Sequence, residues 1–245
     1  AAPYRKGQVL HSVFAAAHYT GYQRAFEEHL VGGEDEVASM LREAASRDPD
    51  RFLGIMTDSW ADLSSVFRDA IMSGAGNCLA HLHGNLQSGD SWTPFVTIDG
   101  ASLAGKVIHE LGLNSEYWQH NRAASNALNA CANVVEDADQ AQRMIKFATC
   151  FLTMREEASI SGDGVDHLDV GINMARGHIA EALVILTINF LKSGNALPDS
   201  LLRLLFDFAD EGDPAIAAVI LRRLAYLQSL DSGIGWAAAK TECNT

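Results

Sequence analysis

The amino-acid sequence predicts an all-α fold, and three observations support this prediction. Alanine and leucine dominate, only five prolines occur in 245 residues, and the alternating runs typical of β-strands are scarce. Apolar residues recur at helical spacing near both ends of the chain. Towards the C-terminus, three such stretches are joined by very short turns, so their helices must pack as antiparallel neighbours. We therefore expect a right-handed α-solenoid of HEAT-like antiparallel helix pairs.

Four helices are expected before residue 77. Glycine and proline mark their ends, and Gly74 and Gly76 are expected to stop the fourth helix. Acidic residues open the second helix, where the helix dipole favours negative charge. The four expected helices cover residues 8–30, residues 34–47, a short segment opened by Asp48-Pro49, and residues 59–73.

Residues 77–99 form a less regular stretch, interrupted by Gly84, Gly89 and Pro94. Helical patterns resume over residues 101–111, 115–135 and 137–157. We expect a single helical-repeat region over residues 1–245, as a fragment of a larger protein. If that region has two lobes, the 77–99 stretch is where they divide.

Residues 173–230 give the clearest architectural pattern. The first helix of this stretch is apolar on most of its circumference, which is typical of a helix buried between other helices. A second helix follows, rich in leucine and phenylalanine. Asp213-Pro214 then opens the third helix, because aspartate is a preferred N-cap and proline at the first helical position loses no hydrogen bond.

The composition limits the classes of partner. The formal net charge is −13, from 18 basic and 31 acidic residues, and duplex nucleic-acid binding needs clustered positive charge. The four cysteines show no CxxC spacing and are expected to be free, buried thiols. No signal peptide is visible, and the longest apolar run is too short to span a bilayer. We expect a cytoplasmic protein that binds neither nucleic acid nor membrane.

One nucleotide-binding motif and one hydrolase motif each match the sequence only in part. Residues 100–106, GASLAGK, fit the phosphate-loop pattern GxxxxGK, but Val107 occupies the place of the hydroxyl that would hold Mg²⁺. Ser102 lies in a GxSxG-like context whose second glycine is missing. A turn that leads into a helix explains this stretch better, so we expect no ATP site, no catalytic residue and no cofactor.

Two groups of side chains could still form sites. His81 and His83, with Asp90 and Asp99, could give a metal site or the active site of a stand-alone enzyme in the 77–99 region, although the histidine spacing fits no closed zinc set. His109-Glu110 begins like HExxH but lacks the second histidine. The candidate partner contacts are aromatic and arginine residues, which are typical interface anchors: Tyr117, Trp118 and Arg122. Packing of aromatic side chains at the start of a helix explains Tyr117 and Trp118 better than a recognition patch does.

One stretch resembles a known family. Asn173-Met-Ala-Arg176-Gly177-His-Ile-Ala-Glu181-Ala-Leu is similar to the N-x-x-R-G-x-x-x-E-A-L signature in the C-terminal helical region of large bacterial signal-transduction ATPases with numerous domains, including the antiviral sensor type. Weaker similarities lie at Asp213-Pro214, at residues 47–52 and at residues 67–74. The chain carries no complete Walker motif and no effector domain. The resemblance therefore implies a sensor or scaffold part, separate from the catalytic parts.

The sequence leads to one preferred function and one alternative. The preferred function is a non-catalytic, protein-binding or target-sensing helical scaffold, resembling the sensor arm of a bacterial antiviral-defence ATPase. The alternative is the enzyme or metal-binding protein with its site at residues 77–99. Within the signature, Gly177 permits close backbone approach, Asn173 can cap a helix, and Arg176 is expected either to clamp a carboxylate such as Asp169 or to contact a ligand.

Overall fold

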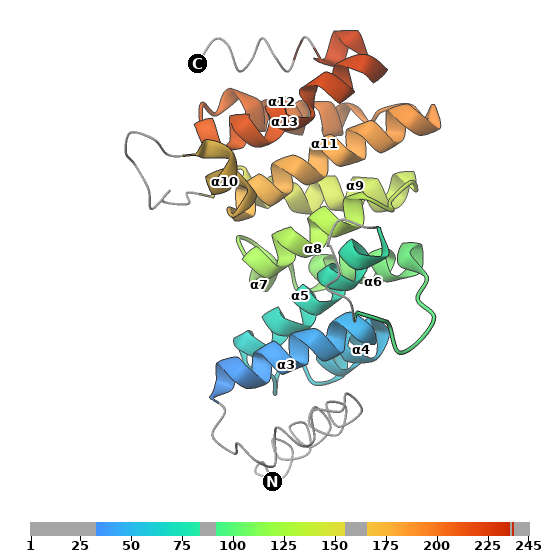
Figure 1. Ribbon diagram of the computed structural model, residues 1–245, viewed down its shortest axis with the longest axis vertical. Helices are drawn as coiled ribbons and strands as arrows, with labels where there is room; N and C mark the ends of the chain where they lie inside the picture. The colour runs from blue at the N-terminus through green and yellow to red at the C-terminus, as the bar shows by residue number, and fades with distance from the viewer. Residues whose placement is uncertain (1–32, 84–91, 155–165, 236, 238–245) are drawn as a thin grey trace. The chain divides into compact units, whose positions relative to one another are not determined.

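The computed structural model describes residues 33–83, 92–154, 166–235 and 237, and these residues form helices joined by turns and loops (Figure 1). No strand occurs among them, so the all-α prediction is confirmed for these ranges. The expected helix at residues 8–30 lies outside the described residues. The chain divides into two compact units, residues 1–107 and 108–245, and the division falls within helix α6 (Gly100–Leu113).

The first unit contains three described helices before α6. They are α3 (Glu34–Arg47), α4 (Pro49–Asp58) and α5 (Ser65–Leu82). The predicted bounds of α3 and the start of α4 at Pro49 are confirmed. The prediction for the next helix was wrong: α5 begins at Ser65 rather than Ser59, and it continues through Gly74 and Gly76. Gly74 lies against α3, where an added Cβ would be 2.6 Å from the Arg42 carbonyl oxygen. The glycine therefore serves helix packing and does not end the helix.

The stretch expected to be irregular is partly helical. Residues 77–82 belong to α5, while residues 92–99 form a non-helical segment that packs on the end of α3. The Trp92 indole donates a hydrogen bond to Ser46 Oγ (3.1 Å) and stacks on His81 at 4.3 Å between ring centroids. The Phe95 amide donates to the Arg47 carbonyl oxygen (2.9 Å). These contacts fix the segment to the first unit.

The second unit contains the remaining helices after α6. They are α7 (Ser115–Trp118), α8 (Arg122–Ala132), α9 (Ala138–Ala148), the 3₁₀ turn η2 (Thr149–Phe151), α10 (His167–Ile172), α11 (Ala175–Ser193), α12 (Asp199–Asp210) and α13 (Pro214–Leu230). The expected single helix over 115–135 is divided in two. His120 interrupts it with a φ of 61°, and its Nε2 atom bonds the Cys150 carbonyl oxygen at 2.7 Å.

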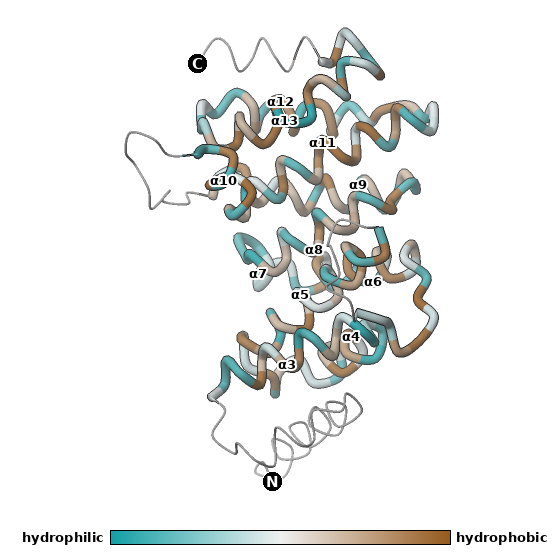
Figure 2. Tube along the Cα trace, in the orientation of Figure 1, coloured by the Kyte–Doolittle hydropathy of each residue, from teal (hydrophilic) through white to brown (hydrophobic). Residues whose placement is uncertain are grey.

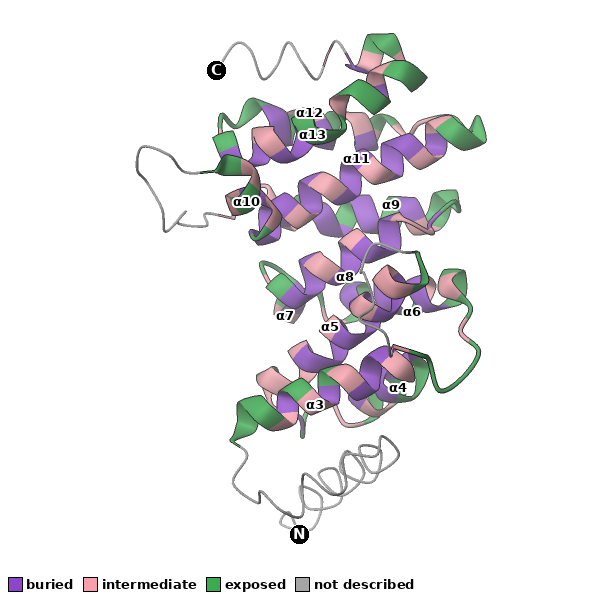
Figure 3. Ribbon diagram, viewed as in Figure 1, coloured by how far each residue is buried: buried purple, intermediate pink, exposed green. Residues whose placement is uncertain are grey.

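Helix α11 is the centre of the second unit. It packs between α8 and α13, which lie on either side of it, and it also contacts α9, α10 and α12 (Figure 1). Most of its residues are buried, and apolar residues recur along its length, as Figures 2 and 3 show. The helix ends at Gly194, whose φ of 68° is the left-handed conformation that favours glycine. The prediction of a buried helix is confirmed.

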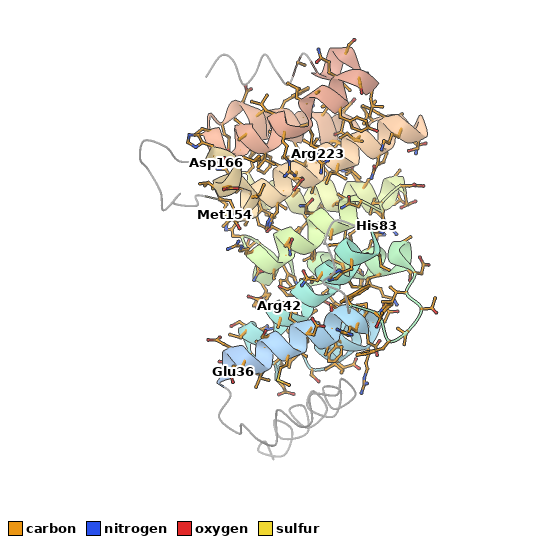
Figure 4. The ribbon with its side chains drawn as sticks, in the orientation of Figure 1. Glu36, Arg42, His83, Met154, Asp166 and Arg223 are labelled. Atoms are coloured by element: carbon orange, nitrogen blue, oxygen red, sulfur yellow. The ribbon has the colours of Figure 1, made fainter. Side chains whose placement is uncertain are left out.

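Aspartate side chains cap the N-termini of several helices of this unit. Asp213 Oδ1 accepts a hydrogen bond from the Ala215 amide (2.9 Å), and Pro214 is the first residue of α13, so the predicted start of this helix is confirmed. Asp137 caps α9 in the same way, and Asp166 caps α10 (Figure 4). None of the described helices combines the length and the apolar character that crossing a bilayer requires.

Candidate functional site

Arg176 forms a buried ion-pair cluster at the start of α11. Only 7% of the residue is exposed. Its guanidinium pairs with Glu211 and lies 3.7 Å from Asp213 Oδ2, while its Cζ atom is 5.7 Å from the centre of the Phe208 ring. The carboxylates that pair with Arg176 come from the turn between α12 and α13, whereas Asp169 was the example given from the sequence. The cluster joins the start of α11 to that turn.

Gly177 and Gly171 allow three helices to meet at the same place. A Cβ atom added to Gly177 would lie 1.8 Å from the carbonyl oxygen of Gly171 in α10. A Cβ atom on Gly171 would in turn lie 2.3 Å from the Ala215 carbonyl oxygen in α13. The expected close backbone approach at Gly177 is confirmed. Asn173 follows α10 and donates from Nδ2 to the Asp169 carbonyl oxygen (2.7 Å), which caps the end of that helix.

Glu181, the fourth residue of the signature, belongs to a different environment. It lies one turn further along α11, and its carboxylate pairs with Arg222 and, at 3.4 Å, with Arg223 of α13. Asn129 of α8 donates to the other carboxylate oxygen of Glu181 (3.2 Å). One carboxylate thus connects three helices. Figure 4 shows Arg223 where α13 lies beside α11.

These contacts belong to a largely polar surface that we call the polar face, in which Ile185 is the partly exposed apolar residue between Glu181 and Asn189. In α8, residues three or four positions apart remain partly or fully exposed, and equivalent stripes follow on α11 and α13. The polar residues of the face are Arg122, Asn126 and Asn129 on α8, with Asn133 directly after it; His178, Glu181, Asn189 and Lys192 on α11; and Arg222, Arg223 and Tyr226 on α13.

Hydrogen bonds and ring contacts cross the polar face from helix to helix. His178 Nδ1 lies 3.3 Å from Ser125 Oγ, and its Nε2 atom lies 2.9 Å from the Ile172 carbonyl oxygen. Further along, Asn189 donates to the Ala132 carbonyl oxygen (2.8 Å). The Lys192 ammonium lies 5.1 Å from the centre of the Tyr226 ring. The face is therefore held in one arrangement before any partner binds.

The polar face carries an excess of positive charge. Four of its residues are arginine or lysine, and Glu181 is its one carboxylate. The whole chain has a net charge of −13, so this surface is opposite in sign to the protein average. Its asparagines also offer amide groups that can both donate and accept hydrogen bonds. The face can therefore bind carboxylates and exposed peptide groups.

The three candidate partner contacts, Tyr117, Trp118 and Arg122, differ in how far they are buried. Trp118 is fully buried, and its indole nitrogen lies 3.4 Å from Glu110 Oε1, so this side chain cannot contact a partner. Tyr117 is partly exposed and lies edge-on to Trp118 at 4.6 Å. Arg122 is exposed at the start of α8 and belongs to the polar face. Packing explains the tryptophan, whereas Arg122 remains available.

The described residues of the alternative site, His81, His83 and Asp99, belong to no group that could hold a metal ion. His81 stacks on Trp92, and burial lowers its pKa; burial also lowers the pKa of His83, which follows the end of α5 (Figure 4). Asp99 accepts a hydrogen bond from the Ala101 amide (3.1 Å), and Asp90 lies outside the described residues. Across the described parts of the chain, no group of three histidine, cysteine or acidic residues is placed to hold a metal ion.

The GxxxxGK stretch is the first part of α6. No strand precedes it among the described residues, and Gly100 is the first residue of the helix. Lys106 pairs with Asp50 Oδ2 at 2.7 Å, and Val107 is fully buried. A phosphate loop needs free backbone amides between strand and helix, and a helical backbone does not provide them. The expectation of a turn leading into a helix was wrong for this stretch, because residues 100–106 are themselves helical from Gly100 onward.

The described cysteines are free thiols. Cys78 and Cys131 are buried, which confirms the expectation for these two, and Cys150 is partly exposed. Burial, assisted by the negative charge of Asp50, raises the pKa of the Cys78 thiol to about 12, and burial also raises the pKa of Cys131. Both thiols therefore stay protonated near neutral pH and are poor nucleophiles. Cys243 lies outside the described residues.

Comparisons with protein-family models, with curated proteins and with solved structures found no match to this chain.

Sequence reasoning missed most of the polar face. The available signal was the spacing of Asn126, Asn129 and Asn133 in an alanine-rich helix. Asparagine is a weak helix former, so a regular asparagine stripe in a helix suggests a role for its amide groups. Arg222 and Arg223 lie off the apolar stripe of α13 in the sequence, but nothing local indicated that both would reach Glu181.

Proposed function

We propose that this chain is a non-catalytic helical scaffold that binds an extended, acidic segment of a partner protein along the polar face. The observation that carries the proposal is the cluster in which Glu181 joins Asn129 to Arg222 and Arg223 across three helices. Because all of these side chains come from helices, the positions of the charges are set by the fold. An acidic segment would meet a prearranged surface, which reduces the ordering cost of binding.

The arrangement of helices in the second unit supports a repeat scaffold. Helices α8, α11 and α13 follow one another in contact, and α9 and α12 also contact each other and α11. Short turns join α11 to α12 and α12 to α13. This is the arrangement expected of HEAT-like antiparallel pairs in a right-handed α-solenoid, and we propose that architecture for the chain. In such scaffolds one helix of each pair contributes to a continuous binding surface.

Charge complementarity selects the kind of partner. The cationic residues of the polar face project from exposed or partly exposed positions, with side-chain exposures of 34% for Arg222 and 44% for Arg223. Their pairing with Glu181 is therefore weak enough to be shared with an incoming carboxylate. Arginine favours carboxylates because its planar guanidinium can form two parallel hydrogen bonds. A sensing role in bacterial antiviral defence, which the resemblance implies, stays a prediction.

A peptide-binding experiment tests the proposal. A short fluorescein-labelled polyglutamate peptide serves as the probe, and a polyglutamine peptide of the same length serves as the neutral control, with binding followed by fluorescence anisotropy. We expect the wild-type chain to bind the polyglutamate probe and not the polyglutamine control. Binding of the probe should weaken as the salt concentration rises. Arg223→Glu should weaken binding at least about tenfold, since it replaces an attraction by a repulsion.

The matched control changes the same residue type on another helix of the second unit. Arg203 of α12 is exposed and lies off the polar face, so Arg203→Glu makes the same change in net charge. The proposal requires Arg203→Glu to bind close to wild-type affinity. Equal weakening by both variants would mean that the peptide responds to net charge only, and equal binding of both peptides would contradict the acidic partner.

A further inference from the structure

The second unit has a pocket that is separate from the polar face. It has a volume of about 430 Å³ and lies between the end of α6, the start of α7 and helix α9 with the turn that follows it. This volume falls within the range of roughly 300–1,000 Å³ that is common for small-molecule sites. The pocket is partly open to solvent, so a ligand could enter without unfolding a helix.

The walls of the pocket combine apolar and cationic side chains. Ile108 and Phe147 are buried apolar residues at its wall, and Leu113, which is 60% exposed, adds a third apolar side chain. The polar part of the lining is mostly basic: His109 comes from α6, and Arg143 and Lys146 come from α9. No aspartate or glutamate lines the pocket.

The cationic residues form no ion pair within the described residues. Neither Arg143 nor Lys146 pairs with a carboxylate there, although the chain as a whole carries a large excess of acidic residues. The two are three positions apart on α9, where like charges repel each other. The nearby carboxylate of Glu110 is buried and accepts hydrogen bonds from Asn114 (2.7 Å) and Trp118 (3.4 Å). A bound anion would relieve the repulsion.

The geometry points to a site for a small organic anion, with its apolar body against Ile108, Leu113 and Phe147 and its acidic group between Arg143 and Lys146. A carboxylate, sulfonate or phosphate group would satisfy the cationic residues, and the apolar walls favour a ligand with a hydrocarbon or aromatic body over a bare inorganic ion. The backbone at Cys150, which also lines the pocket, is held by His120, whose φ of 61° is unusual for a residue other than glycine.

Fluorescence titration with 8-anilinonaphthalene-1-sulfonate, an aromatic sulfonate, tests this site. We expect saturable binding to the folded chain, at temperatures well below its melting transition. Decanoate should displace the dye. Decanol should reach the same displacement only at a concentration at least about tenfold higher, and inorganic phosphate should not displace the dye at the concentration at which decanoate does. Equal displacement by decanol would overturn the role of the charge, and displacement by phosphate would overturn the role of the apolar walls.

Two variants with a matched control locate the site. Arg143→Gln should weaken dye and decanoate binding at least about fivefold, whereas Arg203→Gln, which removes the same charge from exposed α12, should leave both unchanged. Leu113→Glu places a negative charge at the exposed apolar edge and should abolish binding without affecting the fold. Wild-type affinity in Arg143→Gln would contradict the proposal.

Alkylation of Cys150 gives a readout that does not depend on the dye. Cys150 lines the pocket and is partly exposed, so iodoacetamide should modify it, and peptide mass spectrometry identifies the modified cysteine. Decanoate should slow this modification at least about fivefold, and decanol at the same concentration should not. An unchanged rate in saturating decanoate would show that the anion binds elsewhere and would overturn the proposed site.

Discussion

Two arginine–carboxylate clusters lie on the same helix and differ mainly in burial. The first joins Arg176, at the start of α11, to Glu211 and Asp213; the second joins Glu181, one turn later, to Arg222 and Arg223. In the first cluster the arginine is the buried member: the Arg176 side chain is 9% exposed, and those of Glu211 and Asp213 are 28% and 24% exposed. In the second cluster the carboxylate is the buried member: Glu181 is 12% exposed, and Arg222 and Arg223 are 34% and 44% exposed.

Burial decides what each cluster can contribute. A charge taken out of water must keep its partner, so breaking a buried pair is costly and the cluster behaves as a structural clamp. Exposed arginines exchange readily with water and their pairing adds little to stability, which leaves their charges available to a ligand. One stretch of α11 therefore stabilises the fold at its first turn and contributes to a surface at its second.

The largest expected effect is loss of the buried clamp. Arg176→Ala leaves Glu211 and Asp213 without their cation, and we expect the free energy of unfolding to fall by about 3 kcal/mol, near the lower end for a broken buried pair because both carboxylates are partly exposed. Arg222→Ala should change it by less than about 1 kcal/mol. Urea unfolding followed by circular dichroism measures both. Equal losses would remove the distinction between the two clusters.

A smaller loss is expected from Gly177→Ala. The added methyl group would meet the Gly171 backbone, which cannot move without disturbing α13, so we expect destabilisation of about 1–3 kcal/mol. Gly112→Ala is the control, because nothing lies within 4 Å of a Cβ at this position of α6. It should be neutral or stabilising by up to about 1 kcal/mol. Thermal melting of the two variants beside wild type compares them, and a stable Gly177→Ala would contradict the close approach.

Glu181→Gln sharpens the comparison from the other side. It removes the one carboxylate of the polar face and should change the free energy of unfolding by less than about 1 kcal/mol. The same change releases Arg222 and Arg223, so binding of the polyglutamate probe should tighten severalfold. Anisotropy and urea unfolding on one preparation provide both values. Weaker probe binding in this variant would argue against a carboxylate-binding face.

The smallest expected effect concerns pH in the first unit. Burial lowers the pKa of His81 below its ordinary 6.5, so the folded state favours the neutral ring. The contribution of His81 to stability is therefore complete above about pH 6.5 and is lost as the pH falls from there towards the lowered pKa. We expect the melting temperature of wild type to drop more than that of His81→Gln over this interval. An identical pH dependence of the melting temperature in the two proteins would show that protonation of His81 does not affect stability.

Much of the fold could be predicted from the sequence because its signals are local. The bounds of α3 and the start of α13 at Asp213-Pro214 follow from capping and spacing within a few residues. Two predictions failed where a distant contact decided the outcome. Gly74 resembles a helix breaker, yet α3 packs closely enough to require it, and His120 interrupts a helical pattern and bonds the backbone of Cys150.

The candidate sites were less predictable than the helices. The signature at Arg176 and Glu181 could be recognised, but the partners of both residues come from α12, α13 and α8. The pocket is similar: His109 and Arg143 belong to separate helices, and no local pattern indicates that they share a cavity. Spacing along one helix predicts which side chains share a stripe, whereas tertiary packing decides which stripes meet.

The position of α11 in the chain has a consequence for synthesis. Its apolar surface is covered by α8 and by α13, and α13 ends about 37 residues after α11 does. At translation rates of roughly 5–20 residues per second, that interval lasts about 2–7 seconds. During it, a nascent chain carries α11 with one side uncovered, and for about the first half of it Arg176 also lacks Glu211 and Asp213. A ribosome pause placed between α11 and α13 should therefore increase aggregation of the newly made protein, more than the same pause placed after Leu230.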